Sequence, residues 1–190
     1  MADGYPLIPE ELPQQFRAAM RRLAASVAIV AARGEAGPIG MAATSVTSLT
    51  ADPPAVLVCV NRATALHGLL VPTAPLSVNL LSRDQQDVSA AFGGGVSQDE
   101  RFRIGEWRDG PDGLPELAGA QANLGCVIDA MLAYGTHSIV IARVLRAPDD
   151  GAVLDQRGTE AQGVPDTGGE QLGGRRLGLV VDLDGAVRVE

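Results

Sequence analysis

Aromatic residues and cysteines are scarce in this chain of 190 residues. Aromatic side chains make up 3% of it, so aliphatic side chains and alanine must fill the core. The two cysteines, Cys59 and Cys126, each lie in an apolar stretch, which favours buried reduced thiols over a disulfide. Two cysteines and two histidines at these spacings match no zinc-binding pattern, so no metal site is predicted.

Long apolar runs and clusters of basic residues are also missing. No stretch is long enough to span a membrane, and the first residues, MADGYPLIPEELPQQF, contain neither a basic start nor a hydrophobic segment. The 15 basic residues are scattered and the net charge is −8, which argues against nucleic acid as a partner. We therefore expect a cytoplasmic protein that binds neither membrane nor nucleic acid.

Glycine and proline are plentiful, with 23 and 12 residues, and favour a turn-rich β architecture within one domain. Residues 40–61 form the central stretch, GMAATSVTSLTADPPAVLVCVN. Its first half alternates small and hydroxyl side chains along one predicted strand, and its second half is an apolar strand after the Asp52-Pro53-Pro54 corner. Such small side chains let a flat ligand approach the backbone closely.

Periodicity predicts the remaining elements. Apolar spacing predicts helices over residues 10–23, 64–70 and 84–92, the last capped by Ser82. Further strands are expected over residues 27–32, 75–81, 121–131 and 137–146. The glycine-rich residues 93–113 read as a long lid or mobile loop, in which Trp107 is a packing anchor.

The C-terminal part is expected to differ from the domain of residues 10–154. Residues 155–175 are polar and read as a flexible linker, and residues 176–190 as a hairpin or arm around Asp184-Gly185. Because an isolated two-stranded hairpin is marginal in water, this arm needs its own barrel or a partner subunit to lie on.

Six segments in order resemble the flavin reductase-like proteins of the split β-barrel flavin-binding fold. They are FRAAM, residues 40–62, LSVNLLS, RF at Arg101, GLPELAGAQANLGC and GTHSIVIARV, and the resemblance covers about residues 16–154. It implies a mostly β fold: a split antiparallel β-barrel with Greek-key connections and a few short helices. It also implies a homodimer with flavin at or near the subunit interface.

Taken alone, residues 40–48 are either an ordinary strand or a platform for a flavin ring, and the resemblance favours the platform. Of the residues it implies, Thr44, Ser45 and Asn61 would orient the ring, Arg62, Thr64 and Arg101 would neutralise phosphate, and His137 would be catalytic by positioning nicotinamide. The full predicted cofactor set is Gly40, Met41, Ala42, Thr44, Ser45, Cys59, Val60, Asn61, Arg62, Thr64, Phe92, Arg101 and His137.

Three residues depart from the family pattern. Leu66 stands where Ser or Thr is common, Ala91 where Arg is usual, and Thr136 where the family has Asp. The first two changes remove phosphate donors, each worth roughly 1.5–3 kcal/mol, and so predict weakened flavin binding.

The resemblance implies an NAD(P)H-dependent flavin reductase. Its flavin would be FMN or FAD, its co-substrate NADH or NADPH, and the reduced flavin would serve a separate flavin-dependent monooxygenase. The alternative is a split-barrel protein that binds flavin or another small molecule but has lost NADH turnover, and acts as a carrier, partner subunit or repurposed enzyme.

Overall fold

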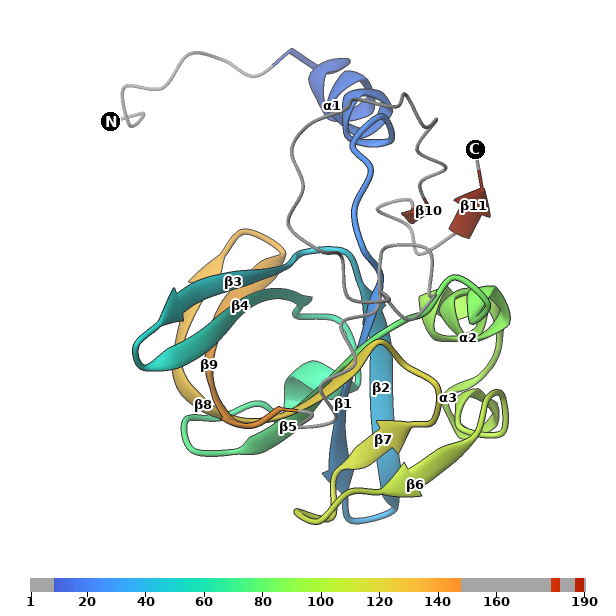
Figure 1. Ribbon diagram of the computed structural model, residues 1–190. Coiled ribbons are helices and arrows are strands. Elements are labelled where there is room, and N and C mark those ends of the chain that lie inside the picture. The colour runs from blue at the N-terminus through green and yellow to red at the C-terminus, as the bar shows by residue number, and fades with distance from the viewer. Residues whose placement is uncertain (1–8, 148–178, 182–186, 190) are drawn as a thin grey trace, which may run out of the picture.

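The computed structural model describes residues 9–147, 179–181 and 187–189, and its main regular structure is antiparallel β-sheet (Figure 1). The main sheet contains β1 (Ala28–Gly34), β2 (Gly37–Ala43), β3 (Val46–Ala51), β4 (Pro54–Asn61), β5 (Pro75–Leu80), β8 (Ala122–Tyr134) and β9 (His137–Arg146). β6 (Trp107–Asp109) pairs with β7 (Pro115–Leu117), and β10 (Leu179–Val181) with β11 (Val187–Val189). The mostly β prediction is confirmed.

The order of the main sheet, β2-β1-β5-β8-β9-β4-β3, places two consecutive strands at its opposite edges. Only Thr44 and Ser45 separate β2 from β3. A flat sheet of this order would be about 29 Å wide, whereas the link from Ala43 to Val46 spans at most about 11 Å. The sheet therefore curls until its edges meet at this link. The described residues contain no β2–β3 ladder, so the barrel is split.

The expected single strand through residues 40–48 is thus wrong. The segment pairs with β1 up to Ala43 and with β4 from Val46 onward. The sequence does not indicate this corner at Thr44 and Ser45, because small and hydroxyl residues continue through it and it contains neither Gly nor Pro. The Greek-key expectation is confirmed by strands β4, β5, β8 and β9, which lie in the order β4-β9-β8-β5.

Aliphatic side chains fill the inside of the curled sheet. Successive side chains alternate between faces, so one side of each strand points inward. The inward set includes Val30, Val58, Val60, Leu66, Leu76, Val78, Ile128, Val140 and Ala142, all buried. The described interior of the barrel is thus an apolar core of aliphatic side chains.

A second apolar cluster covers the other side of β1 and β2. It is built around Phe92, which is buried and lies between Phe102 and Trp107, with ring centroids at 5.0 and 5.2 Å. The predicted packing role of Trp107 is confirmed. The predicted lid over residues 93–113 is wrong, because this segment contains α3 (Gln98–Arg101) and β6 and closes against the cluster.

The helices are shorter than expected. They are α1 (Leu12–Met20), the 3-10 helix η1 (Leu66–Leu69), α2 (Gln86–Ala90) with its π-helical continuation η2 (Ala91–Gly95), and α3. Ser82 does not cap α2; its backbone N–H instead donates to the side chain of Gln85. Among the described helices, none combines the length and the apolar character needed to cross a membrane.

The predicted tail hairpin is found in part, as the pairing of β10 with β11. The linker of residues 155–175 and the Asp184-Gly185 turn lie outside the described residues.

The Phe92 cluster requires glycine at position 40. A Cβ on Gly40 would lie 2.9 Å from a ring carbon of Phe92 and 3.2 Å from Phe102, whereas one on Gly68 would meet nothing within 4 Å. We expect Gly40→Ala to lower the free energy of unfolding by about 1–3 kcal/mol, with a fall in Tm of about 2–4 °C per kcal/mol. Gly68→Ala is the control and should melt like the parent. Equal melting temperatures for both variants, measured by circular dichroism, would contradict the packing described here.

Candidate functional site

The outward side of β3, β4, β9 and the end of β8 forms a nearly flat surface, called the outer face below. Strand register places its side chains in three rows that run across the strands. The rows are Asn61, His137 and Tyr134; Cys59, Ile139 and Leu132; and Thr47, Leu57, Ile141 and Ala130. None of these side chains is buried, whereas their inward neighbours on β4 and β9 are.

The link between the barrel edges is tied to this outer face. The backbone N–H of Cys59 donates to both the carbonyl and the hydroxyl oxygen of Ser45, each at 3.3 Å. The Ser45 hydroxyl donates in turn to the carbonyl of Cys59 at 3.2 Å. Ser45 therefore lies beside the middle row, as the predicted site requires.

The end of β4 carries a tight polar turn. The Asn61 side-chain oxygen accepts the Ala63 N–H at 2.9 Å, and the Thr64 hydroxyl donates to the Asn61 carbonyl at 2.7 Å. Because that hydroxyl proton is committed to the backbone, Thr64 shapes the turn rather than offering a donor. Within the described chain the side-chain amide nitrogen of Asn61 has no acceptor, so it is the donor that remains.

His137 lies opposite Asn61 on β9, next to the β8–β9 turn. Its Nδ1 is 2.8 Å from the hydroxyl of Thr136. The register thus brings together two polar side chains that are 76 positions apart in the sequence. With Nδ1 engaged by Thr136, Nε2 is the nitrogen available to a ligand on the outer face.

Arg62 follows Asn61 and lies against the same turn. Its backbone N–H donates to the Thr136 carbonyl at 3.0 Å, and its guanidinium reaches the Gly135 carbonyl at 3.5 Å. No carboxylate of the described residues lies within 4 Å of it, and its side chain is exposed.

A second group of predicted residues lies on β2, away from these rows. Arg101 donates to the Gly40 carbonyl at 3.0 Å and Gln98 donates to the same oxygen at 3.3 Å. Burial lowers the pKa of the Arg101 guanidinium, and no described carboxylate pairs with it. A partly desolvated cation without a counter-ion favours an anionic ligand.

Several predicted cofactor residues do not face the surface. Val60 points into the barrel core, and Phe92 is buried in the aromatic cluster. Met41 packs on the barrel core and Ala42 on the Phe92 cluster, so on β2 only the backbone is available to a ligand. The side chains of Val60 and Phe92 thus lie in the two apolar cores, and their contact with a cofactor stays a prediction.

The structure changes the interpretation of the three residues that depart from the family pattern. Leu66 is 1% exposed and Ala91 3% exposed, so both side chains belong to apolar cores. They fill space inside the fold, and the expectation that each leaves a surface phosphate site short of a donor is not supported by their burial. Thr136, by contrast, is exposed and in contact with His137.

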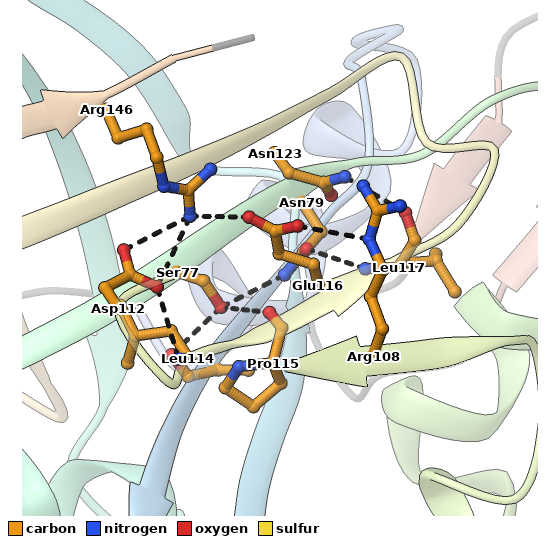
Figure 2. A network of polar contacts seen from close by, with 11 residues as sticks. Ser77, Asn79, Arg108, Asp112, Leu114, Pro115, Glu116, Leu117, Asn123 and Arg146 are labelled. Atoms are coloured by element: carbon orange, nitrogen blue, oxygen red, sulfur yellow. Dashed lines mark hydrogen bonds and ion pairs between the residues drawn. The ribbon is translucent and has the colours of Figure 1, made fainter. Parts of the chain in front are cut away.

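The β6–β7 hairpin covers the outer side of β1 and β5 (Figure 2). Ser77 and Asn79 on β5 are fully buried and polar. The Ser77 hydroxyl donates to the Pro115 carbonyl at 2.7 Å, and the Asn79 side-chain oxygen accepts the Leu117 N–H at 3.1 Å. These hydrogen bonds fasten β7 to the sheet.

Charged groups complete this fastening and line an open hollow beside it. The buried carboxylate of Glu116 pairs with Arg146 at 2.5 Å and with Arg108 at 3.3 Å, and Arg146 also reaches Asp112 at 3.2 Å (Figure 2). Arg108, Glu116 and Arg146 line the hollow. These charges pair within the chain, unlike Arg62, so we assign them a structural role.

Sequence reasoning missed the apolar part of the outer face. Leu57, Ile139 and Leu132 lie in continuous apolar runs, so alternation alone does not show which residues point outward. Sequence reasoning also identified no contact for His67, whose Nε2 is 2.9 Å from the Ser138 hydroxyl at the end of the barrel. In the described part of the chain, no group of three or more His, Cys, Asp or Glu side chains is placed to hold a metal ion.

Comparison with known proteins gives consistent matches. Residues 20–161 match the family model described as flavin reductase like domain. The chain is 43% identical over 143 residues to the reductase component of an FADH(2)-dependent resorcinol hydroxylase from Rhizobium sp. (strain MTP-10005), covering 74% of this chain and 80% of that protein. It is 41% identical over 130 residues to the FMN reductase (NADH) RutF of Pseudomonas syringae pv. syringae (strain B728a), covering 68% and 73%.

A solved structure agrees with these sequence matches. The NADH:FAD oxidoreductase SgcE6 of Streptomyces globisporus C-1027, in complex with NAD and FAD fragments, has a TM-score of 0.67 and 29% identity. The match covers 76% of this chain and 86% of that chain.

The two cysteines should differ in reactivity. Cys59 lies half-exposed on the outer face, whereas burial raises the pKa of the Cys126 thiol to about 12, so almost no thiolate forms there at pH 8. We expect iodoacetamide to label one thiol in the native protein and two after denaturation, as counted by mass spectrometry. Saturating FMN should slow the native labelling.

Cys59→Ser is the control, and this variant should take up no label when native. Labelling of both thiols at equal rates in the native parent would show that the burial of Cys126 is not as described.

Proposed function

The chain belongs to the flavin reductase-like domain family, and on this premise we propose that it is an oxidoreductase that reduces flavin with NADH. The matches carry the proposal, since the relatives are named as an FMN reductase (NADH) and as the reductase component of a hydroxylase. We propose in addition that the reduced flavin serves a separate flavin-dependent monooxygenase. Dependence on NADH is consistent with action in the cytoplasm.

The outer face suits the ring of a flavin. A flat isoalloxazine needs an apolar surface and a few donors and acceptors along its edge. Leu57, Cys59 and Ile139 supply a shallow surface, and the free amide N–H₂ of Asn61 supplies an edge donor. Ser45 stiffens the neighbouring link through its bonds to Cys59, so the surface is preorganised.

Arg62 and Arg101 suit the phosphate of the nucleotide. Both lack a carboxylate partner in the described chain, so their charge is available to an anion. Arg101 lies on the Gly40 carbonyl of β2, and Arg62 follows Asn61 at the end of β4.

His137 suits the positioning of nicotinamide. Thr136 holds Nδ1, and no described residue bonds Nε2, so the ring presents one polar atom beside Asn61. The chemistry supplied by bound flavin is acceptance of a hydride from NADH, which needs no strong general acid from the protein. The side chains are therefore required to orient the two rings.

We also propose that the protein acts as a homodimer. The outer face is open and nearly flat, whereas cofactor sites usually bury most of their ligand. A second copy that covers it would exclude water from the reacting rings.

The proposal is tested by following NADH oxidation at 340 nm with FMN or FAD as acceptor. The parent should oxidise NADH with FMN or with FAD as acceptor. His137→Ala should lower this turnover by about 10-fold or more while the Kd for FMN stays within about twofold, because His137 acts on nicotinamide. Arg143→Ala, which removes an exposed ion pair with Asp129, is the surface control. Flavin quenching without any NADH oxidation would replace the reductase with the flavin-carrier alternative, and the absence of both would overturn the proposal.

The phosphate role of the two arginines can be separated from folding by a choice of ligand. Charge-assisted hydrogen bonds to phosphate are worth roughly 1.5–3 kcal/mol each, so Arg62→Ala and Arg101→Ala should each weaken FMN binding by about 10-fold or more. Riboflavin lacks the phosphate, and its affinity should change little in either variant. Fluorescence titration measures both ligands, and equal losses for FMN and riboflavin would assign the arginines to the ring site or the fold.

A further inference from the structure

The segment that follows β4 holds the start of β9 at two points. The backbone N–H of Arg62 donates to the Thr136 carbonyl at 3.0 Å. Further along the segment, Nε2 of His67 in η1 lies 2.9 Å from the Ser138 hydroxyl. Thr136 and Ser138 are the residues directly before and after His137. The segment therefore fastens the chain on both sides of the histidine that the proposed reaction uses.

Strand geometry connects Ser138 with the direction of His137. Successive side chains of a strand point to opposite faces. Ser138 pairs with Val60, whose side chain points into the barrel. His137 pairs with Asn61, and both lie on the outer face. A bond to the Ser138 hydroxyl fixes the rotation of this end of β9 about the strand axis, so it also fixes the direction in which the His137 ring points.

The contact between His67 and Ser138 is sheltered from water. Ser138 is 4% exposed, and His67 is half-buried. Leu66, which is 1% exposed, anchors η1 in the barrel core beside this contact. Among the described residues, His67 is the hydrogen-bond partner of the Ser138 hydroxyl. Because a buried hydroxyl is costly to leave unpaired, the two side chains hold each other in place.

A serine in contact with a histidine is also the pair of residue types found in a nucleophile and its base. Ser138, however, is buried and points into the barrel, whereas the proposed flavin and nicotinamide lie on the outer face. The hydroxyl therefore faces away from both rings. A positioning role requires no access to them, so it agrees with the burial of Ser138.

We propose that His67 is a positioning residue, which acts through Ser138 to set the direction of His137 and so the placement of nicotinamide on the flavin. This inference rests on the proposed reductase function. Since His67 acts through another side chain, it changes the rate of hydride transfer more than the affinity for flavin. Its contact is made by side chains, so substitution can remove it, whereas the bond from Arg62 uses the backbone N–H.

NADH oxidation with FMN tests this role by comparing two substitutions of His67. His67→Ala removes the contact, and we expect kcat to fall by about 5-fold or more, because a small misplacement of reacting groups is costly. His67→Gln keeps an amide that can bond the Ser138 hydroxyl, so kcat should stay within about twofold of the parent. The Kd for FMN should stay within about twofold in both variants. Gly68→Ala is the matched control, because a Cβ there meets nothing within 4 Å.

Ser138→Ala removes the other side of the same contact and should reproduce the loss seen with His67→Ala. The double variant should be no slower than the slower single variant, since the two residues act as one unit. Losses that multiply in the double variant would overturn the proposal. Equal losses in His67→Ala and His67→Gln, or a Kd for FMN that rises as kcat falls, would also overturn it, because each indicates damage that is not specific to this contact.

Imidazole NMR gives a readout that does not depend on turnover. The chain has two histidines, so in the untagged protein each His67 variant leaves His137 as the sole source of imidazole signals. The ¹⁵N signals of His137 should be displaced in His67→Ala and should coincide with those of the parent in His67→Gln and Gly68→Ala. Unmoved signals in His67→Ala would overturn the positioning role alone. Displaced signals in a protein that does not oxidise NADH would overturn the reductase alone.

Discussion

The two-residue link between β2 and β3 constrains the whole molecule. It joins strands that lie at opposite edges of the main sheet, so the sheet cannot lie flat. Curling places one side of every strand in a packed aliphatic core and the other on the outside. The link itself lies at the surface, where Ser45 fastens it to Cys59 on β4.

The polar groups on the outside of the barrel form a structural set and a candidate binding set. Behind β1 and β5, buried polar and ionic groups pair with one another: Ser77 with the backbone of β7, and Glu116 with two arginines. On the outer face and on β2, Arg62 and Arg101 bond backbone carbonyls but pair with no carboxylate among the described residues. This difference in ion pairing distinguishes the structural contacts behind β1 and β5 from the candidate binding surface.

Sequence patterns predicted those elements in which local signals agree with the fold. β4, β5 and β9 occur within a residue or two of their expected bounds, because β4 is an apolar run that ends at turn residues and β5 alternates apolar with polar side chains. The break after Ala43 is invisible, since both sides of it are extended and equally small in side-chain size. The glycines after Gly93 predict a loop, and no local pattern indicates the contacts of Phe102 and Trp107 with Phe92.

The sequence did not show which predicted site residues share one face of the sheet. Asn61 and His137 are neighbours only through the register of β4 with β9, which no local pattern encodes. In the run from Ala55 to Val60 every residue is apolar, so parity alone could not separate inward Val60 from outward Cys59. Burial likewise changes the reading of Leu66, from a missing donor to a core residue.

The anchoring of Arg146 has a consequence for how this barrel can be extended. The last strand of the main sheet ends at a side chain held by Asp112 and Glu116, and Gly125 leaves the space that this guanidinium occupies. The final turn of the barrel is thus secured by side chains that all precede Ala147. These contacts hold the end of β9 without any residue that follows Ala147, so the segments after it can differ in length without loss of this anchor.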